Sequence, residues 1–266
     1  MYPPLVREPL DGKQPVMTFS IGIDVGGTFT DFLVTSDGEE PRIFKVLSTP
    51  TDPSIGLMNG LSDVAKSWDL SIEQLARQVD TIVHGTTVTT NATLTRTGAK
   101  TGLITTDGLR DALEMRRGIR EEQYNNRYTN VPPLVPRYLR RPAVGRLDRR
   151  GRELTPLSLD DVRDAIELFK KESVEAVAIC FMNAFANSEH EVRAAELVAA
   201  ELPGAYLTAS SDLLPSVRFY NRLSSTVLNA YNGPKLSTYL DSLTRRLAEI
   251  GFDGVLLIMQ SNGGVV

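Results

Sequence analysis

The sequence has little of several residue types that mark particular protein classes. Its 266 residues include one cysteine, two histidines and one tryptophan. A single cysteine, Cys180, excludes an internal disulfide framework and fits a reducing compartment. It lies in the apolar run VEAVAICF, so we expect a buried, inert thiol. His84 and His190 lie far apart, without cysteines at metal-ligand spacing, which argues against a zinc site made by this chain alone.

Long apolar runs and a strong charge of one sign are also lacking. No stretch approaches the roughly 20 apolar residues that span a bilayer. The first residues, MYPPLVREPLDGKQPVMTF, have no apolar core, so they resemble neither a signal peptide nor an anchor. The formal net charge of -4 gives no attraction to nucleic acid or to an anionic membrane. We therefore expect a cytoplasmic protein with a disordered leader at residues 1–18, binding neither nucleic acid nor membrane.

What the chain does contain is an α/β pattern. The stretch FSIGIDVGGTFTDFLV predicts two strands, 19–25 and 28–35, joined by a Gly-Gly turn, and a third strand is expected at 42–47. Helical and strand patterns then alternate, with a strand buried on both faces at 174–181. Two long helices are expected at 216–230 and 234–250. This order predicts a mixed sheet covered by helices.

The Gly-Gly turn is the first candidate site. Asp24 ends the first strand, at the sheet edge where open α/β folds bind ligands. Gly26 and Gly27 permit positive φ and leave space for backbone N–H groups to surround a phosphate, while Thr28 and Thr30 add hydroxyls. A carboxylate beside a phosphate is favourable when Mg²⁺ lies between them. The alternative is a plain hairpin, and the absence of a following helix excludes a dinucleotide fingerprint or a P-loop.

Several motifs carry a family resemblance. The D-x-G-G-T pattern resembles the first phosphate loop of the actin/hexokinase/heat-shock ATPase superfamily, and IGIDVGGTFTD resembles the opening of the hydantoinase A / 5-oxoprolinase family. Further stretches resemble that family in its order: HGTTVTTNATL, GLRDALEMRRG, SSDLLPSVRFYNR, TVLNAY and IMQSNGG.

This resemblance implies a fold and a domain division. The fold would be a ribonuclease H-like (actin-like ATPase) mixed sheet flanked by helices, with an inserted loop-rich subdomain. Residues 19–210 would form the N-terminal actin-like domain of the family, and 211–266 the start of the hydantoinase A domain. The proline- and arginine-rich residues 116–156 would form the insertion rather than core.

The resemblance also implies a chemistry that uses ATP and Mg²⁺ (or Mn²⁺) to phosphorylate a carbonyl oxygen. The leading hypothesis is an ATP-dependent amidohydrolase acting on a cyclic amide such as 5-oxoproline or a hydantoin. The alternative within enzymes is a subunit of an ATP-dependent ketone carboxylase of the acetone or acetophenone type. From another class, the chain could be a non-catalytic scaffold half, and a sugar kinase is a weaker option.

Site residues follow from the matching positions. Asp24 would hold Mg²⁺, and Gly26, Gly27 and Thr28 would contact phosphates. Thr30 and Asp31 would support or polarise the attacking group, which makes Asp24 and Asp31 the candidate catalytic residues.

Substrate contacts are predicted further along the chain. Thr86, Thr87 and Asn91 would lie at a helix N-terminus suited to an anionic or carbonyl ligand, or Thr86 and Thr87 would only cap that helix. Arg116 could face substrate or phosphate. His84 could carry a proton or be a structural histidine. Seven arginines between 137 and 152 indicate a solvated hairpin or a subunit contact rather than a nucleic-acid site.

Two features depart from the family pattern. Family members commonly have an R-E-Y-E-R-like run where this chain has Arg218-Phe-Tyr-Asn-Arg222, without the acidic residues. The family also has a second half with another phosphate loop, which these 266 residues do not contain. We therefore expect the site to be completed by a missing second half or by a partner subunit of the hydantoinase B type, in an oligomer. The fragment alone is expected to be inactive.

Overall fold

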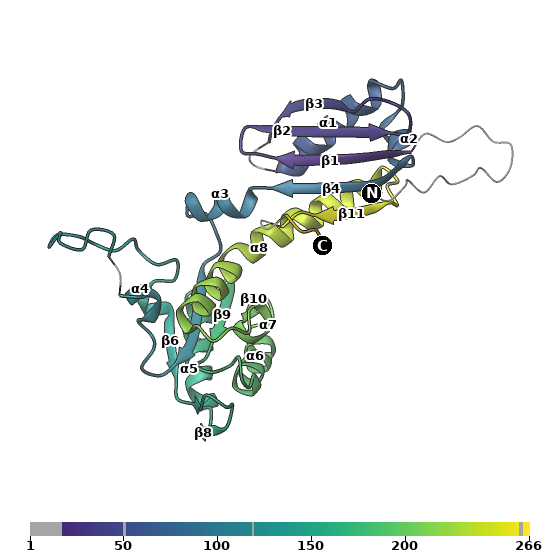
Figure 1. Ribbon diagram of the computed structural model, residues 1–266. Helices are drawn as coiled ribbons and strands as arrows, with labels where there is room; N and C mark the ends of the chain where they lie inside the picture. The colour runs from purple at the N-terminus through teal and green to yellow at the C-terminus, as the bar shows by residue number, and fades with distance from the viewer. Residues whose placement is uncertain (1–17, 50–51, 119, 261–262) are drawn as a thin grey trace. The chain divides into compact units, whose positions relative to one another are not determined.

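The computed structural model describes residues 18–49, 52–118, 120–260 and 263–266. The internal contacts divide the chain into two compact units. The colour in Figure 1 follows the residue number and does not mark these units. Unit 1 combines the residues up to Asn91 with Thr238–Val266, and unit 2 is Ala92–Ser237. Residues 1–17 of the predicted leader lie outside the described residues. The division into family domains 19–210 and 211–266 stays a prediction.

A five-stranded mixed sheet is the frame of unit 1. Its strand order is β11-β4-β1-β2-β3. The strands are β1 (Phe19–Val25), β2 (Phe29–Ser36), β3 (Arg42–Leu47), β4 (Val79–Thr86) and β11 (Val255–Ile258). β1 and β2 form the predicted antiparallel hairpin, β3 pairs antiparallel with β2, and β4 lies parallel to both β1 and β11. The mixed sheet predicted from the sequence is confirmed.

Helices cover one face of this sheet because the strands alternate in burial. β1 buries Ile21 and Ile23 on that face, and β2 buries Phe32. The covering helices are α1 (Pro53–Lys66), which contacts β1, β2 and β3, and α2 (Ile72–Ala76) and the last turns of α8 (Phe219–Glu249), which lie against β4. α1 begins after Asp52, whose side chain accepts a hydrogen bond from the N–H of Ser54 at 3.1 Å. Gly60 lets α1 approach the sheet, since a Cβ there would collide with the Phe32 ring.

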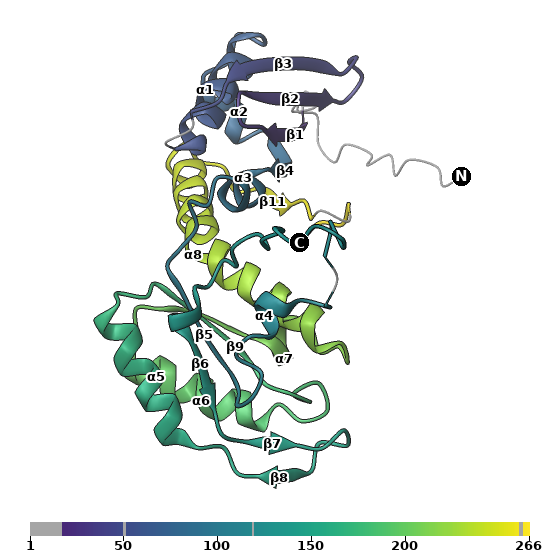
Figure 2. The same cartoon turned by 90° about the vertical axis from the view of Figure 1, so that its left-hand side faces the viewer.

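Unit 2 is built on a four-stranded parallel sheet in the order β10-β9-β5-β6. Its strands are β5 (Thr101–Thr106), β6 (Arg140–Ala143), β9 (Ala176–Cys180) and β10 (Tyr206–Ala209). Every residue of β5 and β9 is buried, which confirms the prediction of a strand buried on both faces at 174–181. α5 (Leu159–Lys171) and α6 (Glu189–Glu201) lie beside this sheet (Figure 2).

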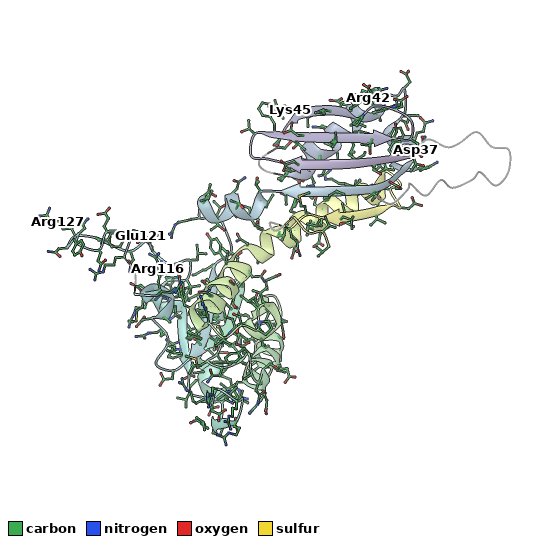
Figure 3. The ribbon with its side chains drawn as sticks, viewed as in Figure 1. Asp37, Arg42, Lys45, Arg116, Glu121 and Arg127 are labelled. Carbon is green, nitrogen blue, oxygen red and sulfur yellow. The ribbon has the colours of Figure 1, made fainter. Side chains whose placement is uncertain are left out.

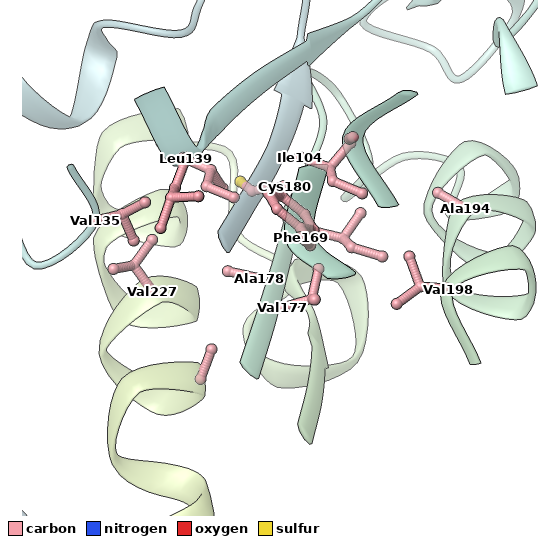
Figure 4. Close-up of a cluster of buried hydrophobic side chains, with 14 of the residues drawn as sticks. Ile104, Val135, Leu139, Phe169, Val177, Ala178, Cys180, Ala194, Val198 and Val227 are labelled. Carbon is pink, nitrogen blue, oxygen red and sulfur yellow. The ribbon is translucent and has the colours of Figure 1, made fainter. Parts of the chain in front are cut away.

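The core of unit 2 is continuous and apolar. Figure 4 shows part of it, with Phe169 of α5, Cys180 of β9 and Val227 of α8 among the labelled side chains. The remaining elements are short: α3 (Val88–Leu94), α4 (Ala112–Met115), the 3₁₀ turn η1 (Arg137–Leu139), β7 (Arg146–Leu147), β8 (Glu153–Thr155) and α7 (Ser210–Leu213). None of the helices in the described ranges combines the length and the apolar character needed to cross a bilayer.

The predicted insertion at 116–156 needs a correction in its second half. Residues 120–133 form no regular element, as expected for a loop-rich segment. In contrast, β6 pairs with β5, and Val135, Leu139 and Ala143 are fully buried in the core. The sequence did not indicate this strand because a parallel edge strand of four residues has too few positions for a recognisable pattern.

The two long helices predicted at 216–230 and 234–250 are one helix, α8, with Pro234 inside it. Proline lacks an N–H and normally ends or kinks a helix. Here the neighbouring turn is held by tertiary contacts: the N–H of Ala99 donates to the carbonyl of Tyr231 at 2.8 Å. The Tyr231 ring lies against Gly98, where a Cβ would collide with it. Packing therefore maintains the helix across a residue that locally opposes it.

Candidate functional site

The loop between β1 and β2 leaves backbone donors exposed. Gly27 and Thr28 are both exposed, and no hydrogen bond of their N–H groups occurs within the described chain. The N–H of Gly26 instead donates to the carbonyl of Phe29 at 3.0 Å. Two adjacent N–H groups without acceptors at a strand end are suited to an anion.

The two glycines matter for the space that their missing side chains leave, and not for unusual backbone angles. Neither Gly26 nor Gly27 has a positive φ, which corrects the expectation that the loop depends on left-handed backbone. A Cβ on Gly26 would lie 3.0 Å from the carbonyl oxygen of Phe29, a close contact, whereas one on Gly27 would lie 3.5 Å from Asn91 Nδ2. Gly26 is needed for the tight loop, and Gly27 keeps the exposed side of the loop clear.

Thr30 does not offer its hydroxyl to a ligand. It is fully buried, and its Oγ1 lies 2.9 Å from the Oγ of Ser48, just beyond β3. Ser48 itself contacts the loop in two further places and was not singled out from the sequence. The only signal for it was its place after the third strand, because a serine at a strand end is common and carries no pattern of its own.

Asp24 and Asp31 lie opposite each other across the hairpin and therefore on the same face of the sheet. Asp24 is exposed, and no hydrogen bond or ion pair of its carboxylate occurs among the described residues. Asp31 forms an ion pair with Lys45 of β3, with Nζ 2.9 Å from Oδ1. Lys45 is labelled on the edge strand in Figure 3. Of the two carboxylates, Asp24 is the one not already paired with a cation.

A divalent cation fits this arrangement only together with a ligand that brings its own oxygens. The described side chains include no group of three acidic, histidine or cysteine residues that could enclose a metal. Mg²⁺ is commonly held by one or two carboxylates, several waters and the phosphates of a nucleotide. Asp24 matches that mode, because the neighbouring Gly85 leaves space: a Cβ there would lie 3.6 Å from Asp24 Oδ1.

The residues after β4 are largely used to hold the backbone. Thr86 Oγ1 accepts from the N–H of Val88, so this threonine caps α3, as the alternative interpretation held. Thr87 Oγ1 donates to the carbonyl of Val25 at 3.3 Å, and Asn91 Nδ2 donates to Thr87 Oγ1 at 3.2 Å. With seven residues, α3 is too short to add a strong helix dipole. The structure nevertheless brings Asn91 to the open side of Gly27.

His84 is structural. It is fully buried on β4, and its Nε2 lies 2.8 Å from the hydroxyl of Tyr239 on α8. Its Nδ1 is buried without a partner among the described atoms. Burial lowers the pKa of His84 to about 4, so the ring is neutral at physiological pH. The interpretation as a structural histidine rather than a proton carrier fits this environment.

Arg116 belongs to unit 2, whereas the other candidate residues belong to unit 1. Its guanidinium forms an ion pair with Glu121, with Nη2 2.6 Å from Oε1, and Tyr128 also donates to Glu121. Both side chains of the ion pair are labelled in Figure 3. The hydrogen bond from Arg116, followed by that from Tyr128, lowers the pKa of Glu121 to about 2. An anion binding to Arg116 would have to compete with this carboxylate.

Three of the seven arginines in the strip at 137–152 make ion pairs within unit 2. Arg137 pairs with Asp111, Arg152 pairs with Asp148, and the buried Arg140 binds Glu114 and the carbonyl of Val135. The hairpin of β7 and β8 carries the exposed arginines. This part of the strip is a hairpin, as predicted, and its role in a subunit contact stays a prediction.

Arg222, at the end of the run that departs from the family pattern, is also structural. It is fully buried and donates to Ser210 Oγ, to the carbonyl of Phe181 and to the carbonyl of Ser216. Ser210 in turn donates to the buried carboxylate of Glu191 at 2.6 Å. The nearby thiol of Cys180 is buried, which raises its pKa to about 12, as expected for an inert cysteine. This network connects α6, α7 and α8 in unit 2.

Known proteins resemble the chain over almost its whole length. The chain is 38% identical over 249 residues to the alpha subunit of a caprolactamase from Pseudomonas jessenii, covering 93% of this chain and 36% of that protein. It is 33% identical to the gamma subunit of an acetophenone carboxylase from Aromatoleum aromaticum, covering 92% of this chain and 35% of that one. The chain thus spans about a third of the length of these relatives.

Solved structures of related enzymes match the fold of this chain. The crystal structure of the ATP-dependent caprolactamase from Pseudomonas jessenii matches with a TM-score of 0.86 over 92% of this chain and 36% of that one, at 38% identity. An acetone carboxylase without nucleotide matches with a TM-score of 0.85 over 94% of this chain and 37% of that one, at 29% identity. The mixed α/β sheet flanked by helices is therefore the fold of ATP-dependent enzymes, consistent with the predicted actin-like architecture.

Residues 20–202 match the family described as the hydantoinase/oxoprolinase N-terminal region. The motifs that suggested this family, the fold and the similarity to its members all agree. The chain belongs to the hydantoinase/oxoprolinase family.

Proposed function

We propose that this chain supplies the first phosphate loop of an ATP-dependent amidohydrolase that opens a cyclic amide of the caprolactam, 5-oxoproline or hydantoin type. The observation that carries this proposal is the pair of exposed residues Gly27 and Thr28, whose N–H groups have no acceptor among the described residues, beside the carboxylate of Asp24, which has no partner among them either. Donors for an anion and a carboxylate for a cation, side by side, are what a metal–nucleotide requires.

Each residue has a defined task in this proposal. The N–H groups of Gly27 and Thr28 donate to phosphate oxygens, and Gly26 keeps the loop tight. Asp24 holds Mg²⁺ or Mn²⁺, directly or through water, and the ion neutralises phosphate charge when it is bound. Asp31, already paired with Lys45, polarises or orients the attacking group. Thr30 contributes to the shape of the loop and not to ligand binding.

The chemistry explains why ATP is consumed. Transfer of the γ-phosphoryl group to the amide oxygen would release ADP and give an O-phosphorylated imidate, whose carbon is more electrophilic than that of the amide. A first water would add to this carbon, and the ring C–N bond would break as the nitrogen takes a proton, which leaves an acyl phosphate. A second water would then displace phosphate and give the carboxylate. The protein mainly positions groups and neutralises charge in such a transfer. Asn91 lies next to the loop, where its amide could orient the substrate carbonyl.

Hydrolysis of a cyclic amide is favoured over ketone carboxylation by sequence similarity. Identity is 38% to the caprolactamase subunit, against 33% and 30% to the acetophenone and acetone carboxylase subunits, and it is 27% to a 5-oxoprolinase, so the similarity favours a caprolactam-type amide most. The names of these relatives, subunits alpha and gamma, support an assembly in which this chain works with further protein. In our proposal that protein completes the nucleotide site and includes a subunit of the hydantoinase B type, in a cytoplasmic oligomer.

The test uses the complete protein that contains this chain. Phosphate release from ATP is measured with caprolactam, 5-oxoproline or hydantoin, and separately with acetone or acetophenone plus bicarbonate. We expect release that depends on a cyclic amide. Release that depends on a ketone and bicarbonate would identify a carboxylase, and no release or nucleotide binding would identify a non-catalytic scaffold.

A matched pair of variants tests the site itself. Asp24→Asn removes the charge that faces the metal and should lower kcat/KM by about 100-fold or more. Asp37→Asn changes an exposed aspartate in the turn after β2 and should leave activity unchanged. Near-normal activity of Asp24→Asn at limiting Mg²⁺ would show that Asp24 does not hold the metal.

A further inference from the structure

A loop that presents N–H groups to an anion must turn its carbonyl oxygens elsewhere. Each peptide unit carries the C=O of one residue and the N–H of the next, and the two groups point in opposite directions. If the carbonyl rotates toward the ligand, the N–H therefore turns away from it and the carbonyl oxygen repels the anion. In the β1–β2 loop, the carbonyl of Gly26 shares its peptide unit with the N–H of Gly27, and the carbonyl of Thr28 belongs to the peptide unit that follows the Thr28 N–H. What holds these two oxygens determines the shape of the loop.

One residue binds both of them. The backbone N–H of Ser48 donates to the carbonyl of Thr28 at 2.9 Å, and the Ser48 hydroxyl donates to the carbonyl of Gly26 at 2.8 Å. The same hydroxyl lies 2.9 Å from Thr30 Oγ1. Since a hydroxyl has a single hydrogen and that of Ser48 is directed at Gly26, Thr30 is the donor in this contact. The buried Thr30 thus orients the Ser48 hydroxyl toward the loop.

The packing of α1 holds Ser48 on the side away from the loop. It follows β3 directly, and α1 packs against this connection through Gly56. A Cβ on Gly56 would lie 3.2 Å from the carbonyl oxygen of Leu47 and 3.4 Å from Ser48 Cα. Because the helix lies this close, Ser48 has no space to move away from the loop. The chain Thr30–Ser48–Gly26 is therefore held between the hairpin and α1.

We propose that Ser48 is a positioning residue for phosphate binding. Its hydroxyl fixes the peptide unit that carries the Gly27 N–H, and its N–H fixes the peptide unit after Thr28. The Gly27–Thr28 peptide, which carries the Thr28 N–H, is thereby held between two fixed peptide units, so that both N–H groups stay available to the phosphates of a nucleotide. Ser48 does not touch the ligand and acts through the loop. This inference rests on the proposed function, because it assigns the anion at this loop to bound ATP.

Four variants of the complete protein test the proposal, with affinity for MgATP measured by calorimetry and the unfolding midpoint in urea measured in parallel. Ser48→Ala removes the hydroxyl but keeps the N–H, and Ser48→Thr keeps both. Thr30→Val removes the donor that orients Ser48. Thr35→Val is the control, because Thr35 Oγ1 likewise donates to a backbone carbonyl of the hairpin, that of Ser20 in β1, but at the end far from the loop.

We expect Ser48→Ala to raise the Kd for MgATP about tenfold, the effect of about one net hydrogen bond. Thr30→Val should raise Kd by a smaller factor, and Ser48→Thr should stay within about twofold of wild type. Thr35→Val should lower the urea midpoint about as much as Ser48→Ala does, with no change in Kd.

Three results would overturn the inference. Unchanged MgATP affinity in Ser48→Ala, with a lowered urea midpoint, would mean that Ser48 only stabilises the fold. Equal loss of affinity in Thr35→Val would mean that any weakening of the hairpin has this effect. Equal loss in Ser48→Thr would mean that the hydroxyl is not responsible. The proposed function fails separately, when wild type itself neither binds MgATP nor releases phosphate.

Discussion

Acidification should destabilise unit 1 through a single buried side chain, His84. The ring lies in the core on β4, with Nε2 bonded to the Tyr239 hydroxyl and Nδ1 without a partner among the described atoms. Burial lowers its pKa from 6.5 to about 4. A proton added to this ring would place a charge in an apolar interior, which costs more than leaving it on the unfolded chain in water.

The sign and size of the effect follow from the two pKa values. The folded pKa lies below the unfolded one, so the unfolded chain binds the proton first as the pH falls. The contribution of neutral His84 to stability is complete above pH 6.5, decreases between pH 6.5 and about 4, and changes no further below that. The full difference corresponds to about 3 kcal/mol of unfolding free energy. Of this, about 2 kcal/mol is lost between pH 7.5 and pH 5.

The assay can isolate unit 1 because Trp68, the single tryptophan, lies within it. Urea unfolding followed by its fluorescence at pH 7.5, 6 and 5 gives the pH slope for wild type and for His84→Gln. We expect the wild-type free energy to fall by about 2 kcal/mol more than that of the variant, since other titrating groups contribute to both. In a His190→Gln background the only imidazole is that of His84, and NMR can then follow its titration in the folded protein.

Two outcomes would contradict this reasoning. One is an equal pH slope in wild type and His84→Gln. The other is a folded-state titration of His84 near 6.5, which would mean that water or a rearranged partner solvates the ring.

Three further predictions concern the loop, the buried network and the isolated chain. Gly27→Val should weaken MgATP binding about tenfold or more while leaving the urea midpoint nearly unchanged, since its Cβ meets only Asn91 Nδ2 at 3.5 Å; equal affinity would remove the role of the open loop. Arg222→Met should cost about 3 to 5 kcal/mol in unfolding experiments, because it removes three charged hydrogen bonds and leaves Ser210 Oγ and the carbonyls of Phe181 and Ser216 without this donor. A cost below about 1 kcal/mol would show that this network is not needed. The isolated 266-residue chain should fold and bind ATP at about millimolar Kd without turnover, and micromolar binding by calorimetry would mean that one loop suffices.

Local patterns in the sequence predicted those strands and turns in which burial follows a regular pattern along the chain. The run around Cys180 is apolar at successive positions, and such a run can only be a strand buried on both faces or a buried helix. The hairpin of β1 and β2 was equally readable, because burial alternates along both strands around two glycines. The candidate loop was found for the same reason: Asp24, Gly26 and Gly27 are neighbours in sequence.

Contacts between distant residues decided what the sequence left open. Pro234 marks a helix end by local rules, yet α8 continues through it, because Ala99 and Gly98 hold the preceding turn from another part of the chain. Thr30 has the same residue type as Thr28, but burial against Ser48 removes it from the ligand side. Ser48 carries no signal of its own in the sequence. Its position beside the loop is set by the pairing of β3 with β2 and by the packing of α1, and such long-range pairing is what a linear pattern does not contain.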